Sequence, residues 1–189
     1  MLNFDFYTPT KVFFGKDRQK ELGKIISGYG YKKIMLIYGK GSMKSSGLYD
    51  EITASLGEYN IEFTEYGGVE PNPKIEFIRN AVKIAKKENS ELILAVGGGS
   101  VIDAAKYTAL GAVSDCDIWD FVIRKETPKC ALPVGCVLTI SAAGSEMSAS
   151  AVVTDLSLNM KRGFTSELIR PLFAVCNPEL TYTVSPYQT

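Results

Sequence analysis

The stretch Leu-Ile-Leu-Ala-Val-Gly-Gly-Gly-Ser-Val-Ile-Asp-Ala-Ala-Lys at residues 92–106 decides the fold class. Its first five residues form an apolar run that predicts a buried parallel strand, and three glycines then end it. Ser100 opens an alanine-rich segment that predicts a helix over residues 100–112. Such a helix directs free backbone N–H groups and the positive end of its dipole at one place, which suits a phosphate. Because only glycine allows so close an approach and so sharp a turn, the stretch predicts a phosphate or dinucleotide pocket.

Two other interpretations of this turn stay open. Ser100 and Asp103 form a Ser-x-x-Asp pattern, close to a capping box, in which both side chains satisfy N–H groups of the helix end. Glycine-rich strand-to-helix turns also occur where nothing binds, because tight loops use positive φ angles. Three consecutive glycines favour the phosphate site, since a cap needs none of them.

Composition limits the class of protein. The chain has 189 residues, 46% of them hydrophobic, and a net charge of +0, which predicts one α/β unit. Neutral charge argues against nucleic acid or an acidic membrane surface as the main partner. No apolar run is long enough to span a membrane, and the first residues lack the pattern of a signal peptide.

Cysteine and histidine content restricts the chemistry. The four cysteines are scattered without Cys-x-x-Cys spacing, which favours reduced thiols in a cytoplasmic protein and argues against zinc. The chain has no histidine, so imidazole acid–base chemistry and histidine-containing metal sites are excluded within these residues.

Strand and helix patterns alternate along the chain, as is typical of βα units. Strands are expected at 11–14, 34–38, 62–66, 92–96, 132–140, 151–154 and 173–176, and helices at 18–27, 46–56 and 100–112. Another helix is expected to begin with Asn72 as N-cap and Pro73 as its first residue. Its apolar residues recur at helical spacing and should face the sheet: Ile75, Ile78, Val82 and Ala85.

A second polar turn, Gly39-Lys40-Gly41-Ser42, follows the strand at 34–38, with Lys44 close behind. In a doubly wound sheet, ligands bind at the carboxyl ends of the strands. A pocket selective for NAD often carries a carboxylate for the ribose 2′-hydroxyl, and this turn has lysines instead. The turn therefore favours NADP(H), with an exposed, solvated Lys40 as the equal alternative.

A third loop, Leu138–Glu146, is rich in small and hydroxyl residues, including Thr139. These residues allow close approach and donate hydrogen bonds. Turns of this composition are common, so a helix entry with Ser145 as N-cap is an equal alternative.

Six ordered segments carry a resemblance: Tyr-Gly-Lys-Gly-Ser at 38–42, Gly-Gly-Val-Glu-Pro-Asn-Pro at 67–73, the glycine-rich decapeptide at 97–106, Ile-Trp-Asp-Phe at 118–121, Gly-Ser-Glu-Met at 144–147, and Asn-Pro-Glu-Leu-Thr-Tyr-Thr at 177–183. Together they resemble the N-terminal domain of iron-containing (group III) alcohol dehydrogenases, in particular the butanol dehydrogenase branch. The resemblance covers essentially the whole chain. Singly, only the decapeptide is specific.

The resemblance implies a Rossmann-like dinucleotide-binding domain over residues 1–189, in which parallel strands are flanked by helices. An all-helical domain would follow it, absent from this chain, with one Asp and three His holding Fe²⁺ or Zn²⁺. The chain end is accordingly expected to be a cut before further structure. The resemblance implies these cofactor-binding residues: Gly39, Gly41 and Ser42 at the adenosine end, Gly97, Gly98, Gly99 and Ser100 at the pyrophosphate, Asp103 near the nicotinamide, Asn72 and Thr139 along the cleft, and Lys161 at the ribose.

The implied whole protein is a cytoplasmic, homodimeric, metal-dependent NAD(P)H alcohol dehydrogenase or aldehyde reductase for small primary alcohols such as butanol. This half alone would be inactive. Alternatives are a relative of glycerol dehydrogenase or dehydroquinate synthase, and a nucleotide-binding module without catalysis. The chain departs from the family pattern at three positions: Ala143 stands for the usual Thr, Lys40 for Gly and Asn177 for Asp. The first departure puts one cofactor hydrogen bond in doubt.

Overall fold

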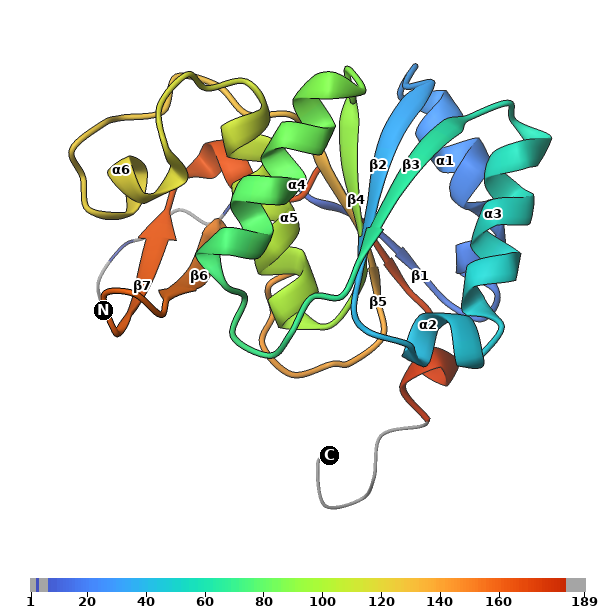
Figure 1. Cartoon of the computed structure of the whole chain (residues 1–189). Coiled ribbons are helices and arrows are strands. Elements are labelled where there is room, and N and C mark those ends of the chain that lie inside the picture. The colour runs from blue at the N-terminus through green and yellow to red at the C-terminus, as the bar shows by residue number, and fades with distance from the viewer. Residues whose placement is uncertain (1–2, 4–6, 183–189) are drawn as a thin grey trace.

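A six-stranded sheet, parallel throughout, forms the middle layer of the structure (Figure 1). The computed structural model describes residue 3 and residues 7–182. Across the sheet the strands are β1 (Lys11–Phe14), β8 (Phe173–Cys176), β5 (Val134–Leu138), β4 (Leu92–Gly97), β2 (Lys33–Tyr38) and β3 (Glu62–Gly67). The fold is therefore the Rossmann-like α/β class that the sequence predicts.

The central strands are apolar because helices cover both of their faces, as parallel sheets require. All six residues of β4 are buried. Alternate residues serve opposite cores: Ile93 and Ala95 belong to one cluster, and Leu92, Leu94 and Val96 to the other. This alternation follows from the two-residue period of a strand.

Two pairs of helices form the outer layers (Figure 1). On one face lie α1 (Leu22–Gly28) and α3 (Leu48–Glu58), and on the other α4 (Ile75–Lys87) and α5 (Gly99–Ala112). Ala104, Ala105 and Ala109 are fully buried in α5, so their small side chains bring that helix close to its neighbours. Two short helices complete the set, α2 (Ser42–Ser45) and α6 (Ile118–Val122).

An antiparallel hairpin of β6 (Ser150–Asp155) and β7 (Met160–Thr165) lies outside the main sheet. It is joined to the helices by specific bonds. The Tyr107 hydroxyl of α5 donates to the Ala151 carbonyl at 3.0 Å, and the Thr154 N–H donates to the Pro73 carbonyl at 2.9 Å. The hairpin thus fixes the loop that precedes α4.

The strand positions agree with the sequence-based expectations, apart from β7, which was not predicted. The predicted start of α4 is wrong: Lys74 is its N-cap, and Asn72 has a left-handed φ of 57°. The buried residues of α4 are Ile75, Ile78, Ala81 and Ala85, and Val82 is partly buried against the same core, so the predicted face is confirmed with Ala81 added to it. In the described part of the chain, no helix combines the length and apolar character needed to cross a membrane.

Candidate dinucleotide-binding site

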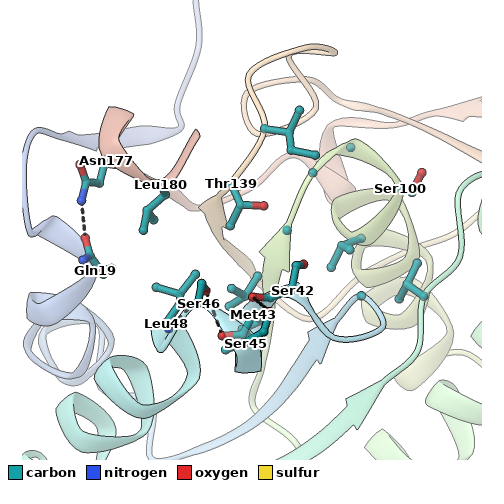
Figure 2. Close-up of a pocket in the computed structure, with 18 of the residues that line it drawn as sticks. Gln19, Ser42, Met43, Ser45, Ser46, Leu48, Ser100, Thr139, Asn177 and Leu180 are labelled. Carbon is teal, nitrogen blue, oxygen red and sulfur yellow. Dashed lines mark hydrogen bonds between the residues drawn. The ribbon is translucent and has the colours of Figure 1, made fainter. Parts of the chain in front are cut away.

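A cavity of about 870 Å³ opens at the carboxyl ends of β2, β4 and β5 (Figure 2). The chain leaves β2 toward β3 at one edge, and leaves β4 toward β5 on the other side. Neighbouring strands whose connections diverge leave a crevice between their ends, the usual ligand site of an open α/β sheet. The size matches that of small-molecule and cofactor pockets.

The glycine turn between β4 and α5 lines this cavity. None of its three glycines has a positive φ, so the alternative that explains them by positive φ angles alone is wrong. Their requirement is space. A Cβ on Gly97 would lie 2.5 Å from Val101 Cγ2, one on Gly98 3.4 Å from Ile140 Cβ, and one on Gly99 3.2 Å from Ala143 Cβ. Packing therefore requires glycine at position 97, is tight at position 99, and leaves room for a methyl group at position 98.

The N-terminus of α5 has no side-chain cap. Gly98 is the N-cap, and the Ser100 hydroxyl accepts instead from the Asn72 N–H at 3.3 Å. Asp103 accepts from the Ser145 hydroxyl at 2.7 Å and from the Val152 N–H at 3.0 Å. The capping-box alternative is therefore wrong. Because N–H groups of a first helical turn have no acceptor within the helix, those of α5 are available to an anion in the cavity.

Ser145 likewise starts no helix. It is buried in a turn, where its hydroxyl meets Asp103. Burial raises the pKa of the Asp103 carboxyl, against the opposing effect of its hydrogen bonds from Ser145 and Val152.

The structure brings most of the predicted site residues together. Those that line the cavity are Gly39, Ser42, Gly97, Gly98, Gly99, Ser100 and Thr139 (Figure 2). Gly41 lies between two of them in sequence without lining the cavity itself.

Asn72, Asp103 and Lys161 do not line this cavity. Lys161 Nζ donates to Asn72 Oδ1 at 2.6 Å, and the Asn72 N–H reaches Ser100. Lys161 and Asn72 thus meet the start of α5 through a chain of hydrogen bonds, from outside the cavity wall.

Charged residues at the cavity edge are the main feature that sequence reasoning missed. Four carboxylates line the cavity, and within the described residues each has a lysine partner: Asp17 with Lys20 at 2.8 Å, Glu51 with Lys20 at 3.8 Å, Glu70 with Lys40 at 2.8 Å, and Glu179 with Lys16 at 3.2 Å. No local sequence pattern marks them, because they come from separate elements.

The sequence favours NADP(H) because the turn at 39–42 has lysines and no carboxylate nearby in sequence. In the structure, carboxylates from other parts of the chain lie beside both lysines. Lys40 pairs with Glu70, and its ammonium holds the pKa of that carboxyl below its ordinary value. Lys44 pairs with Glu65 at 3.2 Å and lies over the ring of Tyr49. Neither lysine is left as a free charge for a 2′-phosphate.

Asn177, one of the three departures from the family pattern, is buried beside the cavity. Its Nδ2 donates to Gln19 Oε1 at 3.0 Å (Figure 2). Gln19 in turn donates to Glu51 Oε2 at 2.8 Å. A carboxylate at position 177 could not donate this bond, so Asn177 is matched to Gln19.

Metal ligands do not gather in this structure. Within residue 3 and residues 7–182, no three His, Cys, Asp or Glu side chains form a group that could hold a metal ion.

Comparison with known proteins places the chain in a family. The family model of iron-containing alcohol dehydrogenases matches residues 9–178. NADH-dependent butanol dehydrogenase A of Clostridium acetobutylicum is 44% identical over 100% of this chain and 48% of its own length. The NADPH-dependent aldehyde reductase YqhD of Escherichia coli is 39% identical over 100% of this chain and 48% of its own length.

A solved structure gives the same result. The crystal structure of NADH-dependent butanol dehydrogenase A from Thermotoga maritima superposes with a TM-score of 0.96 at 42% identity, covering 99% of this chain and 47% of that one. The chain spans about half the length of the relatives it matches. It belongs to the iron-containing alcohol dehydrogenase family.

Proposed function

We propose that this chain, as one dinucleotide-binding domain over residues 1–189, forms the cofactor-binding half of an alcohol dehydrogenase or aldehyde reductase for small primary alcohols such as butanol. The names of the relatives support this activity, and their greater length makes it a proposal for the full-length protein. The observation that carries the proposal is the start of α5, which has no side-chain cap and whose glycine turn lines the cavity.

The proposed roles follow the positions in the cavity. The N–H groups of Gly99 and Ser100 bind the pyrophosphate, with the positive end of the α5 dipole behind them. Gly39 and Ser42 hold the adenosine end, with Gly41 between them in the same turn, and Thr139 borders the cleft at the end of β5. When bound, the nicotinamide accepts or donates the hydride.

Three further residues have proposed roles at the rim of the site. Asn72 and Lys161 reach the ribose only if the bond between them opens, because they are paired at 2.6 Å. The role of Asp103 near the nicotinamide remains a prediction. Both of its carboxylate oxygens already accept hydrogen bonds from the protein, from Ser145 and from Val152.

The NADP(H) preference expected from the turn at 39–42 is not supported, and we infer instead that NAD(H) binds at least as tightly. Glu70 places a carboxylate at the cavity edge, where it disfavours a 2′-phosphate unless Lys40 neutralises it. Relatives named for NADH are found in Clostridium acetobutylicum and Bacillus subtilis, whereas the Escherichia coli relative is named for NADPH.

The family name implies iron, but the residues described here do not fit a metal site, and the chain has no histidine. We propose that Fe²⁺ or Zn²⁺ is held by residues outside 1–189, and that residues 1–189 alone do not turn over. A homodimer and a cytoplasmic location stay predictions.

The test combines binding and turnover. NADH and NADPH are titrated by nicotinamide fluorescence against wild type and Gly98→Ala, whose added methyl would narrow the cavity wall beside Ile140, the residue it would meet. Wild type should bind NADH, and Gly98→Ala should weaken binding tenfold or more. Wild-type affinity in the variant would show that the site is elsewhere.

Turnover is followed at the nicotinamide absorbance with butanal, Fe²⁺ or Zn²⁺, and either cofactor. The full-length protein should reduce the aldehyde, and residues 1–189 alone should not. Binding by the full-length protein without turnover of any small alcohol or aldehyde would favour the non-catalytic module. Turnover by residues 1–189 would overturn the division of roles.

A further inference from the structure

Lys106 of α5 is fully buried, a rare state for lysine. Its Nζ donates to four oxygens of one short segment: the Ser145 carbonyl at 2.8 Å, the Ser145 hydroxyl at 3.0 Å, the Ser148 carbonyl at 2.8 Å and the Ser150 carbonyl at 2.8 Å. An ammonium has three protons, so it shares them among these acceptors. A single buried charge thus anchors the segment 145–150.

Asp103, one turn earlier on α5, binds the same segment from the other side. Its two carboxylate oxygens accept from the Ser145 hydroxyl and from the Val152 N–H of β6. Lys106 and Asp103 together bind carbonyl and N–H groups of residues 145–149, which lie outside any strand, and of the first residues of β6. The remaining titratable groups that face Lys106 are Cys136 of β5, Glu146 and Arg170.

The anchored segment continues directly from a wall of the cavity. Thr139 and Ile140 line the cavity, and the chain then runs through residues 141–144 to the anchor. Ala143 lies over the start of α5, since a Cβ on Gly99 would come within 3.2 Å of its own Cβ. The position of this wall over the uncapped helix end therefore depends on where residue 145 is held.

We propose that Lys106 is a positioning residue, whose ammonium holds the loop 139–150 over the N-terminus of α5 and so sets the affinity of the cavity for a dinucleotide. It does not line the cavity and acts through the loop. This inference rests on the proposed function for its ligand, whereas the anchoring itself rests on the contacts alone.

The test compares Lys106→Met with Tyr107→Phe in the full-length protein. Methionine keeps an unbranched side chain, one heavy atom shorter than that of lysine, and removes all four bonds. Tyr107→Phe removes one buried hydrogen bond, to Ala151, from the adjacent residue of the same helix without touching the loop. Binding of NADH and hydrogen exchange of the backbone amides are measured at equal folded fractions.

Lys106→Met should weaken NADH binding at least tenfold and speed exchange within residues 139–152. Tyr107→Phe should keep the affinity for NADH within twofold of wild type. If Lys106 had a merely structural role, folded Lys106→Met should also keep its affinity within twofold of wild type. Wild-type affinity in folded Lys106→Met overturns the proposal. If that variant does not fold, Ser145→Ala serves instead, and it should weaken binding about threefold with faster exchange in the same loop.

The two hypotheses fail in different ways. A wild-type protein that binds no dinucleotide contradicts the proposed function. Slow exchange of residues 139–152 in Lys106→Met or Ser145→Ala contradicts the anchoring, whatever the ligand.

Discussion

The two turns that meet at the cavity differ in what constrains them. The turn at 97–99 is packed against protein atoms, down to 2.5 Å for an added Cβ on Gly97. In the turn at 39–42, a Cβ on Gly39 would meet only the Val69 carbonyl, at 3.9 Å, and one on Gly41 would meet nothing within 4 Å. The first turn presents backbone alone, and the second lies among exposed ion pairs.

This contrast separates two kinds of recognition. Backbone N–H groups at a fixed helix end suit the pyrophosphate, which every nicotinamide dinucleotide shares. Exposed side chains in an open turn suit the ribose, where the cofactors differ. Substitutions should therefore change fold and overall affinity at the first turn, and cofactor preference at the second.

Gly97→Ala should have the largest effect. Its methyl group would overlap Val101 on α5 and force the helix start away from β4, at a cost of about 1–3 kcal/mol in the free energy of unfolding. Urea denaturation measures this loss, with Gly98→Ala as the matched control because its Cβ would lie 3.4 Å from Ile140. Equal stability of the two variants would contradict the packing argument for the first turn.

The next largest effect concerns the buried charge of Lys106, which anchors the loop 139–150 beside the first turn. Burial lowers the pKa of Lys106 from 10.5 to about 8. Between these values the unfolded chain binds more protons than the folded chain, so this group makes the free energy of unfolding rise with pH. At its steepest one group contributes about 1.4 kcal/mol per pH unit.

The measurement is the difference in unfolding free energy between wild type and Lys106→Met, taken from pH 7 to pH 10. Wild type should gain stability relative to the variant above about pH 8 and run parallel to it below. The comparison cancels groups present in both proteins. Curves that stay parallel throughout would show that folding does not lower the pKa of Lys106.

At the second turn, Glu70→Gln should shift cofactor preference toward NADPH. Removing the carboxylate frees Lys40 for a 2′-phosphate, and because both side chains are exposed, the gain should be about two- to fivefold in relative affinity, decreasing with salt. Glu65→Gln is the control, since Glu65 pairs with Lys44 and does not line the cavity. An unchanged ratio of NADPH to NADH affinity would exclude Glu70 from cofactor selection.

Gly41→Ala should have the smallest effect. Gly41 has a φ of −146° and open space around its Cα, so an alanine fits without strain. Stability should change by less than about 0.5 kcal/mol. A thermal melt checks this, and a large loss would show that the second turn is as constrained as the first.

Most of the fold could be predicted because its signals are local. The apolar run of β4 and the glycines after it define strand, turn and helix within fifteen residues of sequence. The strand β7 was missed because its residues, Met160–Thr165, are mostly exposed and follow no apolar pattern. The start of α4 was misplaced because the hairpin bond from Thr154 holds the Asn72-Pro73 segment outside the helix.

In the candidate site, too, the features that could be predicted are the ones with a local sequence signal. Glycines and hydroxyl residues at strand ends were identified from their neighbours in sequence. The partners of Lys40 and Lys106 lie about 30 to 44 residues away, so no local pattern predicts that one is neutralised and the other buried. The ion pair of Lys40 and the burial of Lys106 both depend on tertiary contacts between distant parts of the chain.

The pairing of β1 with β8 has a consequence for biosynthesis. Lys11 lies opposite Phe173, and the Thr10 hydroxyl donates to the Pro171 carbonyl, a contact across 161 residues. At ordinary rates of translation the ribosome needs roughly 8–30 s to make the intervening chain. Strand β1, with the exposed Phe14 at its end, stays without its partner for that time. β1 is made before the other five strands of this sheet and can pair only after β8 has been made, so it is the strand of the sheet that waits longest for its partner.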